Sequence, residues 1–156
     1  MMNYVIEGLD LASLRPLFGA SEAALRERGA LRMVVTDHTG FPCRILLEDA
    51  PRDASVILLN HVSRDGSTPY RASHAVFVCE GAGSAARFEN EIPPVMRTRV
   101  LSLRGFDRAG MMFDAVLTEP GEAEAGLAHL FADDAVVEVD VHNAARGCFA
   151  ARARRV

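Results

Sequence analysis

Short alternating or continuously apolar segments recur along the chain, and long helical patterns are rare. Alternation with a period of two is typical of half-buried strands. The segment 55–61 contains Val56-Ile57-Leu58-Leu59, which is apolar on both faces, and is expected to be a central strand. The pattern predicts further strands at 3–6, 31–36, 43–48, 75–79, 100–106, 111–118 and in a terminal hairpin at 136–154.

Three short helices are expected from capping residues, prolines and apolar periodicity. They begin after Asp10 (limited by Pro16), after Ser21 (22–28, closed by Gly29) and at Pro120 (to about Phe131). Loops are expected at 62–73 and 81–90, and turns at His38-Thr39-Gly40 and Asp107 to Gly110. Because strands mostly follow strands, the chain is predicted to be an α+β fold. We expect a mostly antiparallel sheet or partial barrel with about three short helices, a C-terminal β-hairpin, and one domain over 1–156.

The terminal hairpin has the clearest alternation. Its first strand places three valines on the core face and three polar residues on the other: Val137, Val139 and Val141 against Glu138, Asp140 and His142. Phe149, Ala151 and Ala153 suit the apolar face of the second strand. Matching these faces around a loop at 143–147 predicts three cross-strand pairs. They are His142 with Cys148, Asp140 with Ala150, and Glu138 with Arg152.

This register gives the sharpest catalytic hypothesis. Opposed Cβ atoms lie about 4.5–5.5 Å apart, so His142 could hold Cys148 as a nucleophilic thiolate, with Asp140 orienting the imidazole. Asn143 and backbone N–H groups could stabilise an oxyanion. The alternative interpretation is an exposed Glu138–Arg152 pair and a cysteine that only packs at a strand end.

The same strand offers two carboxylates and an imidazole at alternate positions. Glu138, Asp140 and His142 could hold Fe(II), Mn or Zn if another ligand came from elsewhere. A solvated strand face explains the spacing equally well, so no metal site and no cofactor are predicted. A single Gly81-Ala82-Gly83 is not a dinucleotide motif.

A second polar cluster follows the central strand: Asn60, His61, Arg64, Tyr70, Arg71, Ser73 and His74. Arg71 with Tyr70 and Ser73 could hold a carboxylate or phosphate, although ordinary surface and loop roles are the alternative. All 17 basic residues are arginine, which lowers the information in each one. Arg97, Arg99 and Arg104 are therefore expected to be solvated or ion-paired.

Composition narrows the classes of function. A chain of 156 residues with 49% hydrophobic residues fits one globular domain, and a net charge of −4 argues against nucleic-acid binding. Three widely spaced cysteines argue against a disulfide framework or a zinc knuckle. No apolar run could cross a membrane and no signal peptide is recognisable, so we expect a cytoplasmic protein with no membrane partner.

Several segments carry a family resemblance across the chain: Phe41-Pro42-Cys43-Arg44, Ser67 to Ser73, Gly110 to Ala115, and above all His142-Asn143-Ala144-Ala145-Arg146-Gly147-Cys148-Phe149-Ala150-Ala151-Arg152. In these segments the chain resembles the bacterial domain of unknown function 1203 family. The resemblance implies a small single domain and assigns no activity and no functional residues.

Two hypotheses from different classes remain. The first is a small-molecule enzyme or binding protein whose polar or anionic ligand lies between the 60–74 loop and the 142–148 turn. Its candidate ligand-binding residues are Tyr70, Arg71, Ser73, Asn143 and Arg146, with Cys148, His142 and Asp140 as catalytic candidates. The alternative is a non-enzymatic homodimeric interaction module that uses the hairpin or an edge strand.

Overall fold

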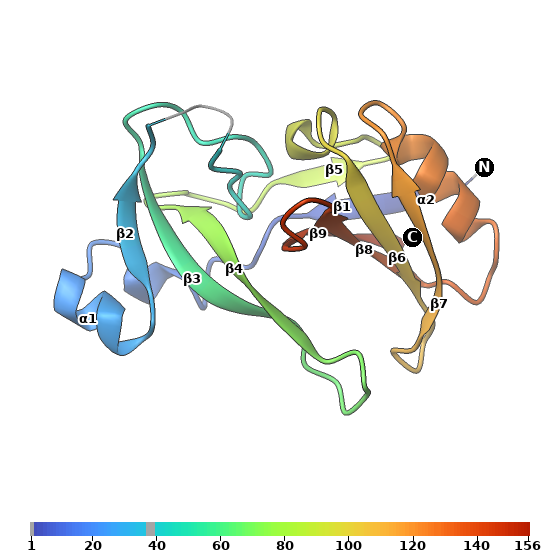
Figure 1. The fold of residues 1–156 in the computed structure, drawn as a ribbon, viewed down its shortest axis with the longest axis horizontal. Helices are drawn as coiled ribbons and strands as arrows, with labels where there is room; N and C mark the ends of the chain where they lie inside the picture. The colour runs from blue at the N-terminus through green and yellow to red at the C-terminus, as the bar shows by residue number, and fades with distance from the viewer. Residues whose placement is uncertain (1, 37–39) are drawn as a thin grey trace.

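The computed structural model describes residues 2–36 and 40–156, and these form two antiparallel sheets (Figure 1). The six-stranded sheet has the order β5 (Arg87–Glu89), β1 (Tyr4–Glu7), β9 (Phe149–Arg155), β8 (Glu138–Asn143), β6 (Leu101–Phe106), β7 (Met112–Thr118). The three-stranded sheet has the order β2 (Leu31–Val34), β3 (Ser55–Arg64), β4 (Ala72–Cys79). The predicted α+β class, the mostly antiparallel pairing and the C-terminal hairpin are confirmed, whereas the sheets do not close into a barrel.

The described residues contain two α-helices, so the prediction of about three is wrong by one. They are α1 (Glu22–Glu27) and α2 (Ala123–Phe131). Ser21 caps α1 as expected, because its hydroxyl accepts a hydrogen bond from the Ala24 N–H at 3.1 Å. The first expected helix is only a 3₁₀ turn, Arg15–Leu17, since Pro16 lies in its first turn and has no N–H to extend the preceding turn. A second 3₁₀ turn spans Pro94–Met96.

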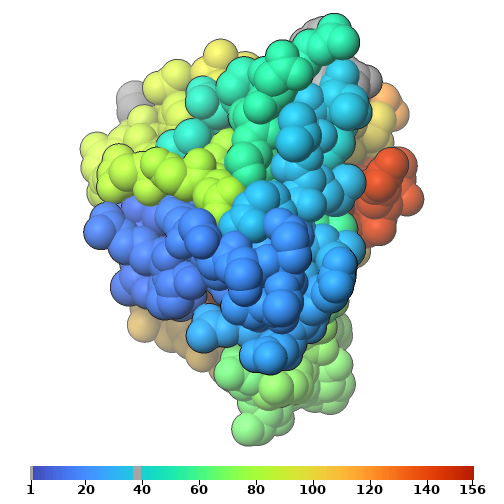
Figure 2. Space-filling view, turned by 90° about the vertical axis from the view of Figure 1, so that its left-hand side faces the viewer, coloured from blue at the N-terminus to red at the C-terminus, as the bar shows by residue number. Residues whose placement is uncertain are grey.

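Each sheet has its own hydrophobic core. One core lies between the six-stranded sheet and α2 and includes Leu103, Leu127 and Val139. The other lies under the three-stranded sheet and includes Leu25, Ile45 and Ile57. Figure 2 shows the N-terminal segment, in blue, covering part of the face of the molecule on this side. The two cores leave the facing surfaces of the two sheets free for polar residues.

The segment 43–48 is not the predicted strand. Within this segment only Cys43 forms an isolated bridge, to Phe77, and the Leu47 N–H donates to the Cys43 carbonyl at 2.9 Å. This tight turn places Cys43 and Ile45 in the core beside the three-stranded sheet and Leu47 in the core of the six-stranded sheet, whereas in a strand all three would lie on one face. The expected turn residues His38 and Thr39 lie outside the described residues.

Two predicted loops contain strand. β3 and β4 run to Arg64 and from Ala72, so the expected loop at 62–73 shrinks to 65–71. The added ends of β3 and β4 are polar because they face the six-stranded sheet. Their polarity is the reason why the sequence predicted a loop. In the same way, β5 lies inside the expected loop 81–90, where it pairs with β1.

The predicted β8–β9 register is wrong by two residues along most of the hairpin. Asp140 pairs with Arg152 and Glu138 with Arg154. A bulge then changes the pairing, so that His142 faces Phe149 and not Cys148. The extra residue on β9 moves Phe149 from the predicted core face to the polar face, where its ring lies 5.5 Å from that of His61.

Candidate anion-binding site

A cavity of about 640 Å³ lies where the two sheets meet the β8–β9 turn. Its size is within the usual range for small-molecule sites. Among the described residues its lining is cationic, polar and apolar and contains no carboxylate: Gly40, Pro42, Arg44, Leu58, His74, Ala75, Phe77, Arg99, Val100, Asn143, Ala144, Ala145, Arg146 and Cys148. A cavity of this composition favours a ligand that carries a negative charge and an apolar part.

The β8–β9 turn supplies one wall. The Gly147 N–H donates to the Asn143 carbonyl at 2.7 Å, and the Asn143 N–H donates to the Cys148 carbonyl at 3.0 Å. Gly147 has φ +76°, a conformation that L side chains rarely adopt. The turn therefore holds Asn143, Arg146 and Cys148 at the cavity, as local sequence had suggested.

The 42–47 segment supplies the opposite wall. The Arg44 N–H donates to the Phe77 carbonyl at 3.0 Å, and the Arg44 carbonyl accepts from Leu9 at 2.9 Å. Gly8 allows this approach, because a Cβ at that position would be 1.9 Å from the Ile45 carbonyl oxygen. These backbone contacts fix Arg44 between the three-stranded sheet and the hairpin.

Arg44 is a buried cation, with only 3% of its surface exposed. Its guanidinium donates to the Phe149 carbonyl (2.9 Å), the Pro42 carbonyl (2.6 Å) and the Cys148 sulfur (3.2 Å). Among the described residues it forms no ion pair with a carboxylate, and burial lowers its pKa. An unneutralised buried charge is costly, so this position favours an anion.

Cys148 is the partly exposed sulfur in this cavity. It accepts hydrogen bonds from Arg44 Nη2 at 3.2 Å and from Asn143 Nδ2 at 3.4 Å. The Asn143 Oδ1 atom is buried without a partner in the described structure, and so is Nδ1 of His74. Buried polar atoms normally have partners, which makes these two atoms candidates for contact with a ligand.

Two further arginines complete the cationic lining. Arg99 binds Asp49 Oδ1 at 2.5 Å and the Val95 carbonyl at 3.0 Å, as expected for an ion-paired residue. Arg146 is exposed in the turn, and no described residue forms an ion pair or hydrogen bond with it. Arg146 can therefore move onto a ligand without breaking an existing contact.

His142 lies close to the cavity, but it does not hydrogen-bond to Cys148 in the described structure. Its Nδ1 lies 2.9 Å from the Gly147 carbonyl, which can only accept, so Nδ1 carries the proton. Burial lowers the His142 pKa to about 4, so the ring is neutral at pH 7. Its ring contacts that of His74 edge-on, with centroids 4.9 Å apart. In the described structure His142 and Cys148 therefore do not form the hydrogen-bonded pair that the catalytic hypothesis requires.

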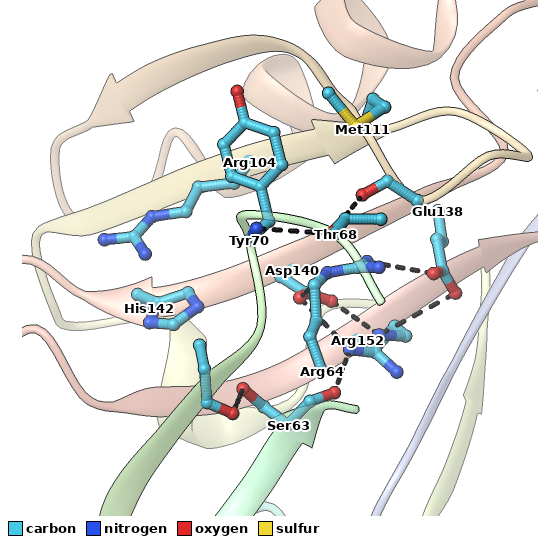
Figure 3. Close-up of polar contacts among 12 residues, drawn as sticks. Ser63, Arg64, Thr68, Tyr70, Arg104, Met111, Glu138, Asp140, His142 and Arg152 are labelled. Carbon is cyan, nitrogen blue, oxygen red and sulfur yellow. Dashed lines mark hydrogen bonds and ion pairs between the residues drawn. The ribbon is translucent and has the colours of Figure 1, made fainter. Parts of the chain in front are cut away.

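Asp140, the third catalytic candidate, belongs to a buried ion-pair cluster between the sheets (Figure 3). Its carboxylate is 1% exposed and binds both Arg64 and Arg152, which also contact Glu138. It does not orient His142 by a hydrogen bond among the described residues. In the described part of the chain, no three or more His, Cys, Asp or Glu side chains are grouped so that they could hold a metal ion.

The 65–71 loop does not reach the cavity. Arg71 is exposed and pairs with Asp65, while Tyr70 packs edge-on against Phe106, with centroids 5.8 Å apart. Ser73 pairs with Val62 inside the extended strands. The structure thus brings Asn143, Arg146 and Cys148 together and leaves Tyr70, Arg71 and Ser73 outside the cavity.

Sequence reasoning missed Arg44, the most deeply buried cation of the site, and assigned no role to Phe77. Arg44 lies in the segment Phe41-Pro42-Cys43-Arg44, which contributed to the family resemblance. The family resemblance of that segment could have pointed to Arg44. It did not, because the many arginines of the chain lowered the weight given to each one.

The fold and cavity define a two-sheet α+β protein with a cavity lined in part by arginines. The chain belongs to the family described as "Protein of unknown function (DUF1203)", which matches residues 40–155. The cavity-lining residues that the structure describes all fall within this match. No curated protein and no solved structure matches the chain. No helix in the described residues has the length and apolar character needed to cross a membrane.

Proposed function

We propose that this protein binds a small organic anion, a carboxylate or phosphate attached to a compact apolar group, in the Arg44 cavity. The supporting observation is Arg44 itself, a buried guanidinium to which no described carboxylate is paired, in a cavity whose described lining contains no acidic residue. A guanidinium has five N–H donors, and Arg44 uses three of them in its bonds to the Phe149 carbonyl, the Pro42 carbonyl and the Cys148 sulfur. Two donors therefore remain for a ligand oxygen.

The remaining lining fits the rest of such a ligand. Leu58, Phe77 and Val100 provide apolar surface, while Asn143 and His74 offer polar atoms that lack partners. Arg146 is placed at the turn, where its side chain can close onto the anionic group. The binding site is thus centred on the 143–148 turn, as the first hypothesis proposed, with Arg44 and His74 in place of Tyr70, Arg71 and Ser73.

Isothermal titration with phenyl phosphate, an anion with an apolar ring, tests this proposal. We expect binding to the wild type and about tenfold weaker binding to Arg146→Gln, since a charged hydrogen bond contributes about 1.5–3 kcal/mol and partial exposure reduces it. Arg28→Gln makes the same charge change at an exposed residue outside the cavity and should bind normally. Equal binding of neutral benzyl alcohol, or no effect of Arg146→Gln, would contradict the proposal.

The alternative is a homodimeric interaction module. The observation in its favour is the edge strand β7, on which Phe113 is 51% and Leu117 is 66% exposed. Exposed apolar edges can pair with a second chain. Light scattering decides this case: a dimer that Leu117→Lys converts to monomer would favour the module, and a monomeric wild type would remove it.

A cytoplasmic location is retained as part of the proposal.

A further inference from the structure

We propose that Cys148 is the reacting group of the cavity, with Arg44 as its counter-ion, and that its substrates are anions carrying an electrophilic carbon. This inference rests on the proposed function, because the anionic group of the substrate would be held in the same cavity. It replaces His142 with Arg44 as the group that supports the thiolate.

The contacts of the sulfur carry the inference. Two N–H groups, one of them cationic, point at Cys148 Sγ from Arg44 at 3.2 Å and from Asn143 at 3.4 Å. A neutral thiol is a weak acceptor, whereas a thiolate binds such donors strongly. Reactive cysteines are typically partly exposed and adjacent to a cation. Cys148 meets both conditions.

The charge balance of the site gives independent support. Arg44 is 3% exposed and has no carboxylate partner among the described residues. Arg64 and Arg152 are also largely buried, but both pair with the Asp140 carboxylate. An ionised Cys148 would neutralise the Arg44 charge within hydrogen-bond distance. The buried Asn143 Oδ1 atom, which has no partner in the described structure, could accept a hydrogen bond from a donor group of a ligand beside Cys148.

The other two cysteines are poorly placed for this chemistry. Cys43 is fully buried and Cys79 is 8% exposed, and neither lines the cavity. The Cys43 sulfur accepts the Cys79 N–H at 3.1 Å and the Leu46 N–H at 3.4 Å, inside the core of the three-stranded sheet. Cys148 is therefore the thiol that a small molecule meets first.

The step is a nucleophilic displacement. The Cys148 sulfur donates an electron pair to the electrophilic carbon, the S–C bond forms, and the bond from that carbon to its leaving group breaks, with the electron pair departing on the leaving group. No oxidant or reductant takes part. The anionic group of the substrate is held by Arg146 and by the unused N–H groups of Arg44, which align the carbon with the sulfur.

Iodoacetate and iodoacetamide form a matched pair of probes, since they deliver the same carbon and leaving group with and without a negative charge. Alkylation of the intact protein is followed by mass spectrometry, and each rate is divided by that of glutathione under the same conditions. A cavity lined by one sign of charge can raise the local concentration of counter-ions at least about tenfold. We expect Cys148 to favour iodoacetate over iodoacetamide by at least about tenfold relative to glutathione.

Variants separate the site from general reactivity. Cys148→Ser should abolish the fast labelling, and Arg146→Gln should slow iodoacetate several-fold while leaving iodoacetamide unchanged. Arg28→Gln should change neither rate. A preference equal to that of glutathione, or faster labelling of Cys43 or Cys79, would overturn the role of Cys148.

The two proposals fail in distinguishable ways. Phenyl phosphate binding without an iodoacetate preference would overturn the role of Cys148 and leave the anion site standing. Absence of both would overturn the anion site itself. Protection of Cys148 from iodoacetamide by phenyl phosphate would place both functions in one cavity and support both.

Discussion

Arg44 and Asp140 show how buried charges serve different purposes in this molecule. Asp140 is neutralised on both sides by Arg64 and Arg152, so its cluster is complete without a ligand. Arg44 binds carbonyl oxygens and a sulfur, and no described carboxylate neutralises its charge. We therefore assign Asp140 to the stability of the sheet-to-sheet contact and propose Arg44 as a ligand-binding residue.

Asp140→Asn tests the structural role of that carboxylate. Removing one partner of a buried ion pair leaves uncompensated charge, so the free energy of unfolding should fall by about 3–5 kcal/mol. Urea unfolding followed by circular dichroism measures the loss. Asp65→Asn breaks the exposed pair with Arg71 and should cost less than about 1 kcal/mol. Equal stability of the two variants would refute the assignment.

His142 predicts a pH dependence of stability. Its pKa is lowered to about 4 in the folded protein, against an ordinary value of 6.5, so the unfolded chain binds a proton more readily. The stabilisation is fully present above pH 6.5 and is lost as the pH falls toward 4. The shift corresponds to about 3 kcal/mol. Burial lowers the pKa of His61 and His74 in the same direction.

Urea unfolding at pH 7 and pH 4.5 checks this expectation, with His142→Phe as the comparison that keeps an aromatic ring. The wild type should lose about 2–3 kcal/mol more than the variant over this interval. The pKa of Glu80 is held at about 2 by its hydrogen bonds to Arg32, so its main loss of stabilisation lies below this interval. An equal loss in both proteins would refute the account of His142.

At the scale of elements, local patterns predicted most strands and the β8–β9 turn, because alternation and turn residues act over short distances. The predicted register was wrong because His142 already pairs one residue further along β9, with Phe149, and a bulge at Ala150, which has no local signal in an alanine-rich strand, adds the second residue. The prediction of a strand at 43–48 was wrong because the shape of this segment is set by backbone contacts with Leu9 and Phe77, which are distant in the sequence. The candidate residues followed the same division. Asn143, Arg146 and Cys148 come from one turn, whereas Arg44 and His74 join them only through tertiary packing.

At the scale of the whole molecule, two sheets with separate cores meet at polar surfaces, and the cavity lies at their junction. The family match begins at residue 40, yet β1 lies between β5 and β9 in the six-stranded sheet. The N-terminal segment therefore supports the sheet that carries Cys148, and the matched region contains the cavity itself. The N-terminal segment thus contributes to the sheet, while the described residues that line the proposed binding cavity lie between 40 and 148.

The most direct test of anion binding is a crystal structure of the protein with phenyl phosphate. The account predicts phosphate oxygens at about 3 Å from guanidinium nitrogens of Arg44 or Arg146, with the ring against Phe77. Phosphate bound outside this cavity, or a cavity without phenyl phosphate at a concentration that saturates binding in solution, would contradict it.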